Sequence, residues 1–568
     1  MKFAPKLLSA LLMAQCALVF AKGNADTIFY GGPILTVNAK NEEVQALAVQ
    51  NGKIVAVGNK DAVTKEWQAD NTKVVDLKGQ TLMPGFIEPH THLILTTMFE
   101  RLWLNLSNYA LPQSSIESIV QKLKAEVKNV PKGGWLTAFG VDPSRTTPFM
   151  AELTANDLDK VSTDVPILVV NTSGHIAYAN HKALEIAGIT NKTPNPKGGG
   201  VFVKDKDGNL TGKLVEAPAF LPFVALMPVP SQSQLVDAIV ATLNSVAAKG
   251  ITSATEISIG GNFGVDKEAA LWRGIFANKA SPIRIRGYLF SDNLPAGYNN
   301  IKPNEGDDYL RFIGIKYVSD GSLQGLTGAL NEPYIYPKGT KERGSLDYKD
   351  AEIYGLMKPY YDQGWQIAIH ANGDRAIEQT LNNYEKLLTS GGNSKDRRLR
   401  IEHFTVSTEA QVKRTVKLGV LPGFTIGHVD YWGETFHNQI LGPERAKRID
   451  PAGDFKRAGG RFSLHSDSPV TPIGPLNYIS EEVTRLWQLP PQKVLGPDQA
   501  VSVDDAIRAV TINPAYSMFA DNIVGSLEVG KQADLVVLAK NPRTTPPAEI
   551  RNIKVIGTYV DGKPIALK

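Results

Sequence analysis

The feature that most constrains the fold is a series of eight strand-like segments. From residue 250 onward these segments alternate with patterns typical of helices, which predicts a parallel sheet. One more such segment precedes a long insertion, and eight in total predict a closed (β/α)₈ barrel of the TIM type. The segments begin at Pro84, Ile251, Ile283, Arg311, Trp365, Leu399, Gly419 and Arg461.

Both ends of the chain are rich in short β-type segments. Residues 26–75 hold three of them, with Gly31-Gly32 and Asn51-Gly52 as turn signals, and residues 533–565 resume the same character with a turn at Asp561-Gly562. We therefore predict a small β-sandwich domain built from both termini. Its expected parts are residues 22–83 and 520–568, which leaves 84–519 for the barrel.

A long stretch separates the first barrel strand from the second. We predict an α+β insertion there, at about residues 94–230. Within it Ser115–Lys128 is expected to form a helix, Val165–Asn171 a buried strand, and Asp207-Gly208 a hairpin turn. The expected fold class is thus α/β: a (β/α)₈ TIM barrel with a small β-sandwich domain from both termini and an insertion after strand 1.

The N-terminal residues have the pattern of a secretory signal. Lys2 and Lys6 introduce a mostly apolar stretch that ends near a small-residue cleavage site at Ala21. We predict a signal peptide over the first 21 residues and a periplasmic or secreted mature protein. The single cysteine, Cys16, would leave with this segment, which excludes disulfides and thiolate ligands in the mature chain. Lipid attachment to Cys16 is the alternative, but Gln15 stands where a lipoprotein signal has a small residue.

The composition narrows the range of partners. Of the 568 residues 42% are hydrophobic and 21% charged, as in an ordinary soluble globular protein. The formal net charge is +4 and includes Lys2 and Lys6, so there is no electrostatic reason to expect nucleic acid or an anionic membrane. The expected partner is a small-molecule substrate, without membrane contact after signal removal. The sequence leaves homo-oligomerisation open.

Polar residues at the strand ends indicate a metal site. His90 and His92 alternate in the first strand, so both imidazoles share one face and can bind one ion through neutral ring nitrogens. A lone HxH pair is a weak pattern. In a (β/α)₈ barrel, however, the active site lies at the C-terminal strand ends, and four further strands carry polar residues there: Lys316, His370, His403 and Asp467 on strands four, five, six and eight.

This ligand order resembles that of the amidohydrolase superfamily of metal-dependent hydrolases: HxH, then Lys, His, His and Asp. The longer phrases PGFIEPHTHL, KYVSDGS, HANGDRAI, RIEHF and HSDSP are similar to its N-substituted formamide deformylase-like branch, amidohydrolase family 3. The resemblance covers nearly all of the mature chain, including the split β-domain and the insertion.

The resemblance implies a set of metal ligands. His90, His92 and Asp467 would bind one ion, and His370 and His403 a second. The expected cofactor is a divalent metal, Zn²⁺ in one or two ions. Such ions lower the pKa of water and polarise a carbonyl group.

Two residues of this set would have further roles. Lys316, once carboxylated by CO₂ on its nitrogen, would bridge two ions as an anion. The alternatives for Lys316 are an ion pair with Asp320 or a contact with substrate. Asp467 would serve as the catalytic general base that later protonates the leaving nitrogen.

Other histidines and one glutamate are assigned by their surroundings in the sequence. His175 in NTSGHIAYAN, Glu216 in GKLVEAP and His428 in TIGHVDYW are candidates for substrate binding. His175 lies where the resembled branch has a histidine near the pocket, and a plain loop histidine is the alternative. Structural roles are expected for the remaining three: His181, His437 and His465.

The resemblance implies an exported hydrolase that cleaves a C–N bond, of the amide or N-acyl and formamide type, with a metal-activated water. Hydrolysis of an ester, lactone or phosphotriester is the alternative, because the same metal site would serve and the leaving-group contacts lie on loops. An inactive exported binding protein is the alternative from another class. The complete ligand set argues against it.

Overall fold

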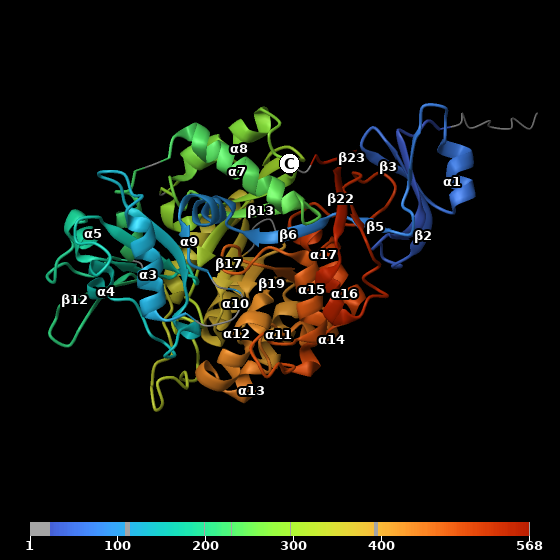
Figure 1. Cartoon of the computed structure of the whole chain (residues 1–568). Coiled ribbons are helices and arrows are strands. Elements are labelled where there is room, and N and C mark those ends of the chain that lie inside the picture. The colour runs from blue at the N-terminus through green and yellow to red at the C-terminus, as the bar shows by residue number, and fades with distance from the viewer. Residues whose placement is uncertain are drawn as a thin grey trace, which may run out of the picture.

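A computed structural model describes residues 23–566 except 108, 110–113, 198, 229, 296 and 391–395. The predicted signal peptide, with Cys16, lies outside the described residues. A central barrel is flanked on one side by a sheet from the two ends of the chain and on the other by the insertion (Figure 1). No helix within the described ranges is long and apolar enough to cross a membrane.

The central sheet confirms the predicted α/β class and TIM barrel. Its eight strands pair in parallel in chain order. A parallel bridge between Thr91 and Ser468 joins the last strand to the first, and the His92 N–H donates to the Ser468 carbonyl over 3.0 Å. The strands are β6 (Phe86–Thr91), β13 (Ile251–Ile259), β14 (Arg284–Phe290), β16 (Leu310–Val318), β17 (Gln366–Ala371), β18 (Arg400–His403), β19 (Leu421–Thr425) and β20 (Ser463–His465).

Helices cover the outside of the barrel because each has one apolar stripe. On α10 the residues Ile377, Leu381 and Tyr384 are fully buried and recur at helical spacing. Inside the barrel, Ile87 packs in one cluster with Met518, which follows α17. The main covering helices are α7 (Gln232–Ala247), α8 (Val265–Ala277), α9 (Asp350–Gln363), α10 (Asp374–Thr389), α11 (Glu409–Lys417), α12 (Gly427–Thr435), α14 (Ala452–Arg457), α15 (Pro475–Thr484), α16 (Val503–Ala509) and α17 (Ile512–Ser517).

Strands from the two ends of the chain share one sheet with the order β23-β22-β21-β5-β1-β2-β3, in which β4 also pairs with β1. The turns expected at Asn51-Gly52 and Asp561-Gly562 are present, with positive φ at all four residues. The helix α1 (Lys60–Trp67) packs on this sheet. The strands are β1 (Thr27–Leu35), β2 (Glu43–Gln50), β3 (Lys53–Gly58), β4 (Lys73–Asp76), β5 (Thr81–Pro84), β21 (Leu535–Leu538), β22 (Val555–Val560) and β23 (Lys563–Pro564).

The turn predicted at Gly31-Gly32 is wrong. A single strand, β1, runs through both glycines, and its register with β2 shifts between Tyr30 and Ile34. Gly31 has a φ of +86°, the conformation that a glycine supplies in a β-bulge. The glycine pair therefore bends a strand and does not end it.

The insertion contains a third sheet with the order β11-β12-β10-β9-β8-β7. Its predicted helix is α3 (Ile116–Val127), which Ser115 caps, and the turn at Asp207-Gly208 joins its β11 and β12. The other elements are β7 (Leu104–Asn105), β8 (Leu136–Val141), β9 (Ile167–Asn171), β10 (Ile176–Ala179), β11 (Val201–Lys204), β12 (Leu210–Val215), α4 (Ala155–Asp159), α5 (His181–Ile186) and α6 (Ala217–Val224).

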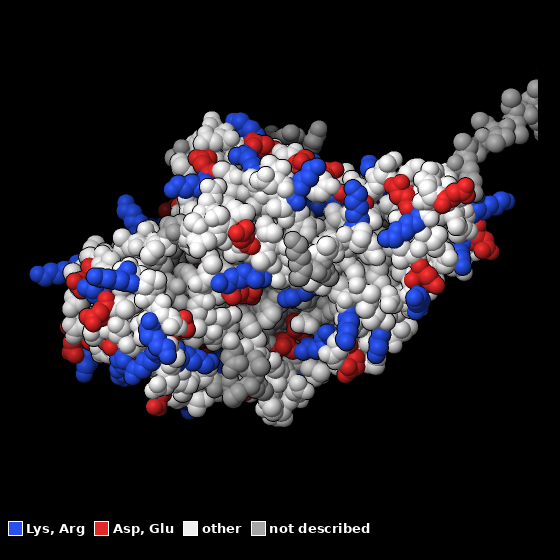
Figure 2. Space-filling model, turned by 45° about the horizontal axis from the view of Figure 1, so that its top comes forward, with Lys and Arg blue, Asp and Glu red and all other residues white. Residues whose placement is uncertain are grey.

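Basic and acidic side chains lie among each other on the face of the molecule shown in Figure 2. They are distributed over the barrel, the terminal sheet and the insertion alike. Both signs of charge are therefore present on each of these parts of the face.

Candidate metal centre

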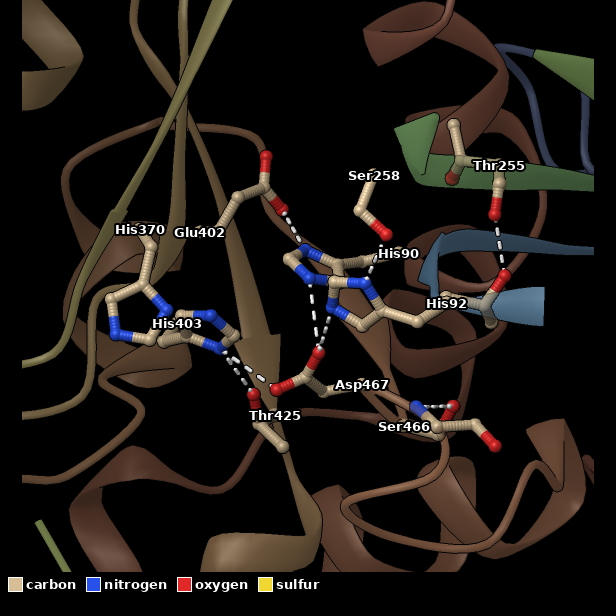
Figure 3. A network of polar contacts seen from close by, with 12 residues as sticks. His90, His92, Thr255, Ser258, His370, Glu402, His403, Thr425, Ser466 and Asp467 are labelled. Atoms are coloured by element: carbon tan, nitrogen blue, oxygen red, sulfur yellow. Dashed lines mark hydrogen bonds and ion pairs between the residues drawn. The ribbon is translucent and has the colours of Figure 1, made fainter. Parts of the chain in front are cut away.

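The strand-end residues singled out in the sequence meet at the C-terminal mouth of the barrel (Figure 3). One oxygen of Asp467, Oδ1, lies 3.0 Å from His90 Nε2 and 3.2 Å from His92 Nε2. These residues come from β6 and from the segment after β20. They therefore meet only because the barrel closes between its first and last strands.

A second pair of histidines lies beside the first. The His370 and His403 rings are 4.3 Å apart between centroids, and the His90 and His403 rings 5.0 Å. His403 Nδ1 lies 3.9 Å from the other Asp467 oxygen, Oδ2. Asp467 thus stands between the two histidine pairs (Figure 3).

Each of the four histidines has one ring nitrogen engaged by a neighbour. His92 Nδ1 contacts Ser258 Oγ, and His403 Nδ1 contacts Thr425 Oγ1, both at 2.7 Å. When a ring nitrogen carries the proton toward such a partner, the other nitrogen keeps its lone pair. The remaining two contacts are His90 Nδ1 to Glu402 Oε2 at 2.7 Å and His370 Nε2 to the Gly321 carbonyl at 3.1 Å.

The free atoms of this arrangement fit a cation. With Nδ1–H donated to Glu402, His90 Nε2 presents a lone pair to the Asp467 carboxylate, and His92 Nε2 does the same. His90 Nε2, His403 Nε2 and Asp467 Oδ1 are buried and have no hydrogen-bond partner among the described residues. Unpartnered buried acceptors are costly, and a metal ion relieves that cost.

The spacing of these atoms also suits a metal. The candidate ligand atoms of His90, His92 and Asp467 all lie within 4.8 Å of one another. In a tetrahedral zinc site with bonds of about 2.0–2.1 Å, ligand atoms are about 3.3 Å apart. The observed separations of 3.0 and 3.2 Å are close to that value.

Burial keeps the histidines in the form that binds metal. It lowers the pKa of His92, and it lowers those of His370 and His403 well below the ordinary value. Burial opposes the charge of Asp467, but the adjacent His90 and His403 hold the pKa of this carboxyl well below its usual range. Burial therefore favours neutral imidazoles on His92, His370 and His403, and the site offers them beside an ionised carboxylate.

Lys316, from β16, lines a cavity that is also lined by His92, His370 and Asp467. Burial lowers the pKa of its amine to about 8, against the opposing effect of Glu402 and Asp467. No described residue forms a hydrogen bond or ion pair with Lys316. Asp320, considered above as its partner, instead accepts the backbone N–H groups of three residues, Ala329, Asn372 and Gly373.

Glu402 is a residue of this site that the sequence reasoning missed. Its carboxylate is fully buried, receives the His90 Nδ1–H and pairs with Arg400 at 2.8 Å. In a regular strand, Glu402 and His403 would point to opposite faces. His403 has a φ of +74°, so the strand departs from that alternation and both side chains reach the interior. No pattern in the sequence signals this departure.

The structure brings two of the three predicted substrate contacts to the cavity. His175 and Glu216 line it, and His175 Nδ1 lies 2.7 Å from Glu216 Oε2. Burial disfavours the charged imidazole, but Glu216 outweighs it and raises the pKa of His175 to about 9. Glu216 has a φ of +62°, a strained conformation of the kind found at functional sites.

His428 and His465 lie elsewhere. His428 is buried on α12, does not line the cavity, and contacts Thr405 Oγ1 at 3.3 Å and Asp450 at 3.6 Å. His465 stacks on His90 with ring centroids 4.6 Å apart. Neither ring nitrogen of His465 has a hydrogen-bond partner among the described residues. His465 therefore packs against a candidate ligand, although its sequence context gave it no role in the site.

The chain is similar to known proteins over most of its length. Residues 73–566 match the model of a family described as the amidohydrolase family. The chain is 28% identical over 551 residues to N-substituted formamide deformylase of Arthrobacter pascens, covering 94% of this chain and 97% of the relative. It is 28% identical over 547 residues to a putative amidohydrolase of Bacillus subtilis (strain 168), with 94% and 98% covered.

A solved structure shows the same fold. An uncharacterized metal-dependent hydrolase from Pyrococcus horikoshii superposes with a TM-score of 0.71 at 23% identity. The match covers 92% of this chain and 99% of that one.

Proposed function

This chain belongs to the amidohydrolase family, and we propose that it is an exported hydrolase of N-acyl or formamide-type amides. Family membership makes it a metal-dependent hydrolase acting on C–N bonds. The amide class is supported by the extended similarity to a formamide deformylase, which spans 94% of this chain. The single observation that carries the proposal is the group of candidate ligand atoms facing one another on His90, His92 and Asp467.

His90, His92 and Asp467 would hold one divalent ion, and His370 and His403 a second. When bound, such ions lower the pKa of water and polarise the carbonyl group of the substrate. Zn²⁺ suits the nitrogen and oxygen donors of this set.

Asp467 moves the proton in the proposed reaction. Its carboxylate accepts a proton from the attacking water, whose oxygen forms a bond to the carbonyl carbon. The C–N bond then breaks, and Asp467 returns the proton to the departing nitrogen. The products are a carboxylic acid, formic acid where the substrate is a formamide, and an amine, and the acid then passes its proton to the amine or to water. His175, held by Glu216, orients the substrate together with the apolar residues that line the cavity.

For Lys316 we propose carboxylation. Its amine is buried beside the ligands without a partner among the described residues, and a pKa of about 8 leaves part of it neutral near pH 7. A neutral amine adds to CO₂ and releases a proton, and the resulting carbamate is an anion that can ligate two cations. Without that reaction a lysine ammonium at this position would repel them.

Export is proposed from the N-terminal residues alone. Lys2 and Lys6 precede a mostly apolar stretch and a small-residue cleavage site at Ala21, the order of parts in a secretory signal. The mature protein would act in the periplasm or outside the cell.

Metal analysis combined with a hydrolysis panel tests the function. The metal-loaded protein should hydrolyse formamides or other simple amides faster than matched esters. His90→Ala should lose metal and turnover together, whereas His181→Ala, an exposed histidine paired with Asp159 on the insertion, should lose neither. A His90→Ala protein with full metal content and full activity would overturn the assignment. Faster turnover of esters would favour the alternative chemistry.

A further inference from the structure

The cavity at the candidate metal centre is lined by two groups of residues, which we call its two walls. One is apolar and is built mainly by the insertion and the segment after β6. The other carries three carboxylates, on Glu216, Asp292 and Asp347. The apolar residues include Leu95, Phe99, Phe139, Val170, Phe220 and Leu221.

The three carboxylates are not equivalent. Glu216 is paired with His175, which offsets its charge. Asp292 accepts a hydrogen bond from the Tyr348 O–H over 3.0 Å. Asp347 is half-buried, and none of the described residues donates a hydrogen bond to its carboxylate. The carboxyl of Asp347 therefore lines the cavity without a hydrogen-bond donor among the described residues.

The backbone around Asp347 directs this carboxylate. Its N–H donates to the Ser319 carbonyl over 3.0 Å, which ties the residue to the end of β16. Gly199 of the insertion backs it so closely that a Cβ atom there would lie 3.2 Å from Asp347 Oδ1. Burial and the neighbouring Glu216 raise the pKa of Asp347 well above its ordinary value. A cationic group bound in the cavity would favour the ionised form of this carboxyl and pair with it.

The same wall lacks what a carboxylate ligand needs. Recognition of a carboxylate in a protein cavity usually relies on arginine or lysine donors. Among the described residues that line the cavity there is no arginine, and Lys316 is the one lysine, at the end occupied by the metal ligands. An anionic substrate arm would therefore lie desolvated against like charges.

We propose that this wall selects substrates that carry an ammonium or guanidinium group remote from the scissile C–N bond, with Asp347 as the main contact. It disfavours substrates with a carboxylate at that position, such as N-acyl amino acids. The inference rests on the proposed amide hydrolysis and names the substrate class for the same site. The apolar wall accommodates the chain between the amide and the cation.

Three formamides, each with a five-carbon chain, test the proposal. They are the mono-N-formyl derivatives of 1,5-diaminopentane, of pentylamine and of 5-aminopentanoic acid, which end in a cation, a methyl group and an anion. With the metal-loaded enzyme, formate release should give the highest kcat/KM for the cationic substrate and the lowest for the anionic one. We expect about tenfold or more between cationic and neutral substrates, the usual effect of one hydrogen bond to a charged group.

Variants at one position separate charge from structure. Asp347→Asn should remove the advantage of the cationic substrate, so that the cationic and the neutral substrate have similar kcat/KM. Asp347→Lys should reverse the order of cation and anion. Asp207→Asn, on the exposed β11–β12 hairpin, is the matched control and should change nothing.

The possible outcomes distinguish the two levels of the proposal. If none of the three formamides is hydrolysed, formamide hydrolysis fails, and the inference fails with it. If formate is released but the neutral or anionic substrate is preferred, the charge selection is refuted while the hydrolase function stands. An unchanged preference in Asp347→Asn would likewise refute the role of this residue.

Discussion

Replacing Glu402 with glutamine should weaken metal binding, although this residue is not itself one of the predicted ligands. Its Oε2 receives the His90 Nδ1–H over 2.7 Å and an Arg400 N–H over 2.9 Å, while Oε1 lies 2.8 Å from Arg400 Nε. Glutamine has nearly the same shape but replaces one acceptor oxygen with an NH₂ donor. In either orientation a donor then faces a donor, on His90 or on Arg400.

The magnitude depends on which contact is lost. With the amide nitrogen toward His90, the ring must carry its proton on Nε2, and the lone pair toward Asp467 disappears. Loss of such an outer partner typically reduces metal affinity about 10- to 100-fold. In either orientation the buried Arg400 guanidinium loses its counter-charge, which costs about 3–5 kcal/mol of stability. Arg400 retains contacts to the Pro89 carbonyl and the Tyr288 hydroxyl, so the lower end of that range applies.

Two measurements separate these effects. Competition with a chromophoric chelator gives the metal affinity, and urea unfolding of the metal-free protein gives the stability. Glu305→Gln is the matched control, because Glu305 also pairs with an arginine, Arg273, but on the surface. A surface pair contributes at most about 1 kcal/mol and should not affect metal. Metal affinity within about twofold of wild type, together with unchanged stability, would refute the role given to Glu402.

Three further predictions concern other parts of the chain. Lys316→Ala should lose metal and activity together, and short carboxylic acids should restore part of the activity. Asp467→Asn should keep most of its metal while the rate falls by about 10² or more. Metal analysis and kinetics on both variants test this, and an active Lys316→Ala protein with two bound ions would contradict the proposed bridge. N-terminal sequencing of protein from the native host should begin near Lys22, and a cytoplasmic chain that keeps its first residue would contradict export. Burial raises the pKa of Glu256 from 4.5 to about 8, so the folded protein keeps a proton that the unfolded chain releases, and stability falls as the pH rises through that range. Glu256→Gln should remove this loss, and urea unfolding at about pH 6 and pH 9 should then differ less than in wild type.

The barrel could be predicted because its strands are short apolar runs separated by helical periodicity. That signal depends on local sequence alone, and all eight segments became strands of one sheet. The bend at Gly31-Gly32 could not be distinguished from a turn, because a glycine with positive φ serves both structures. Only the pairing of β1 with β2 on both sides of the glycines decides between them.

The site could be predicted only in part, because some of its residues are placed by long-range packing that local sequence does not show. Histidines at strand ends are visible in the sequence, and barrel closure brings them together. The position of His428 depends on how α12 packs, which no local pattern fixes, and the helix directs it toward Thr405 and Asp450, away from the cavity. The unpartnered carboxylate of Asp347 was likewise invisible, since it lies in a loop after β16 with no motif around it.

Strand order also determines which nitrogen of each histidine is free. Ser258 on β13 engages His92 of the adjacent β6, Thr425 on β19 engages His403 of the adjacent β18, and Gly321 after β16 engages His370 of the adjacent β17. A slip of one residue in a strand turns its inward side chains outward. A slip in β13 or β19 would remove the partner that orients a ligand on the neighbouring strand, and a slip in β17 or β18 would remove the ligand itself. The metal centre therefore depends on the register of the whole closed sheet, and the HxH motif alone would leave the imidazole lone pairs undirected.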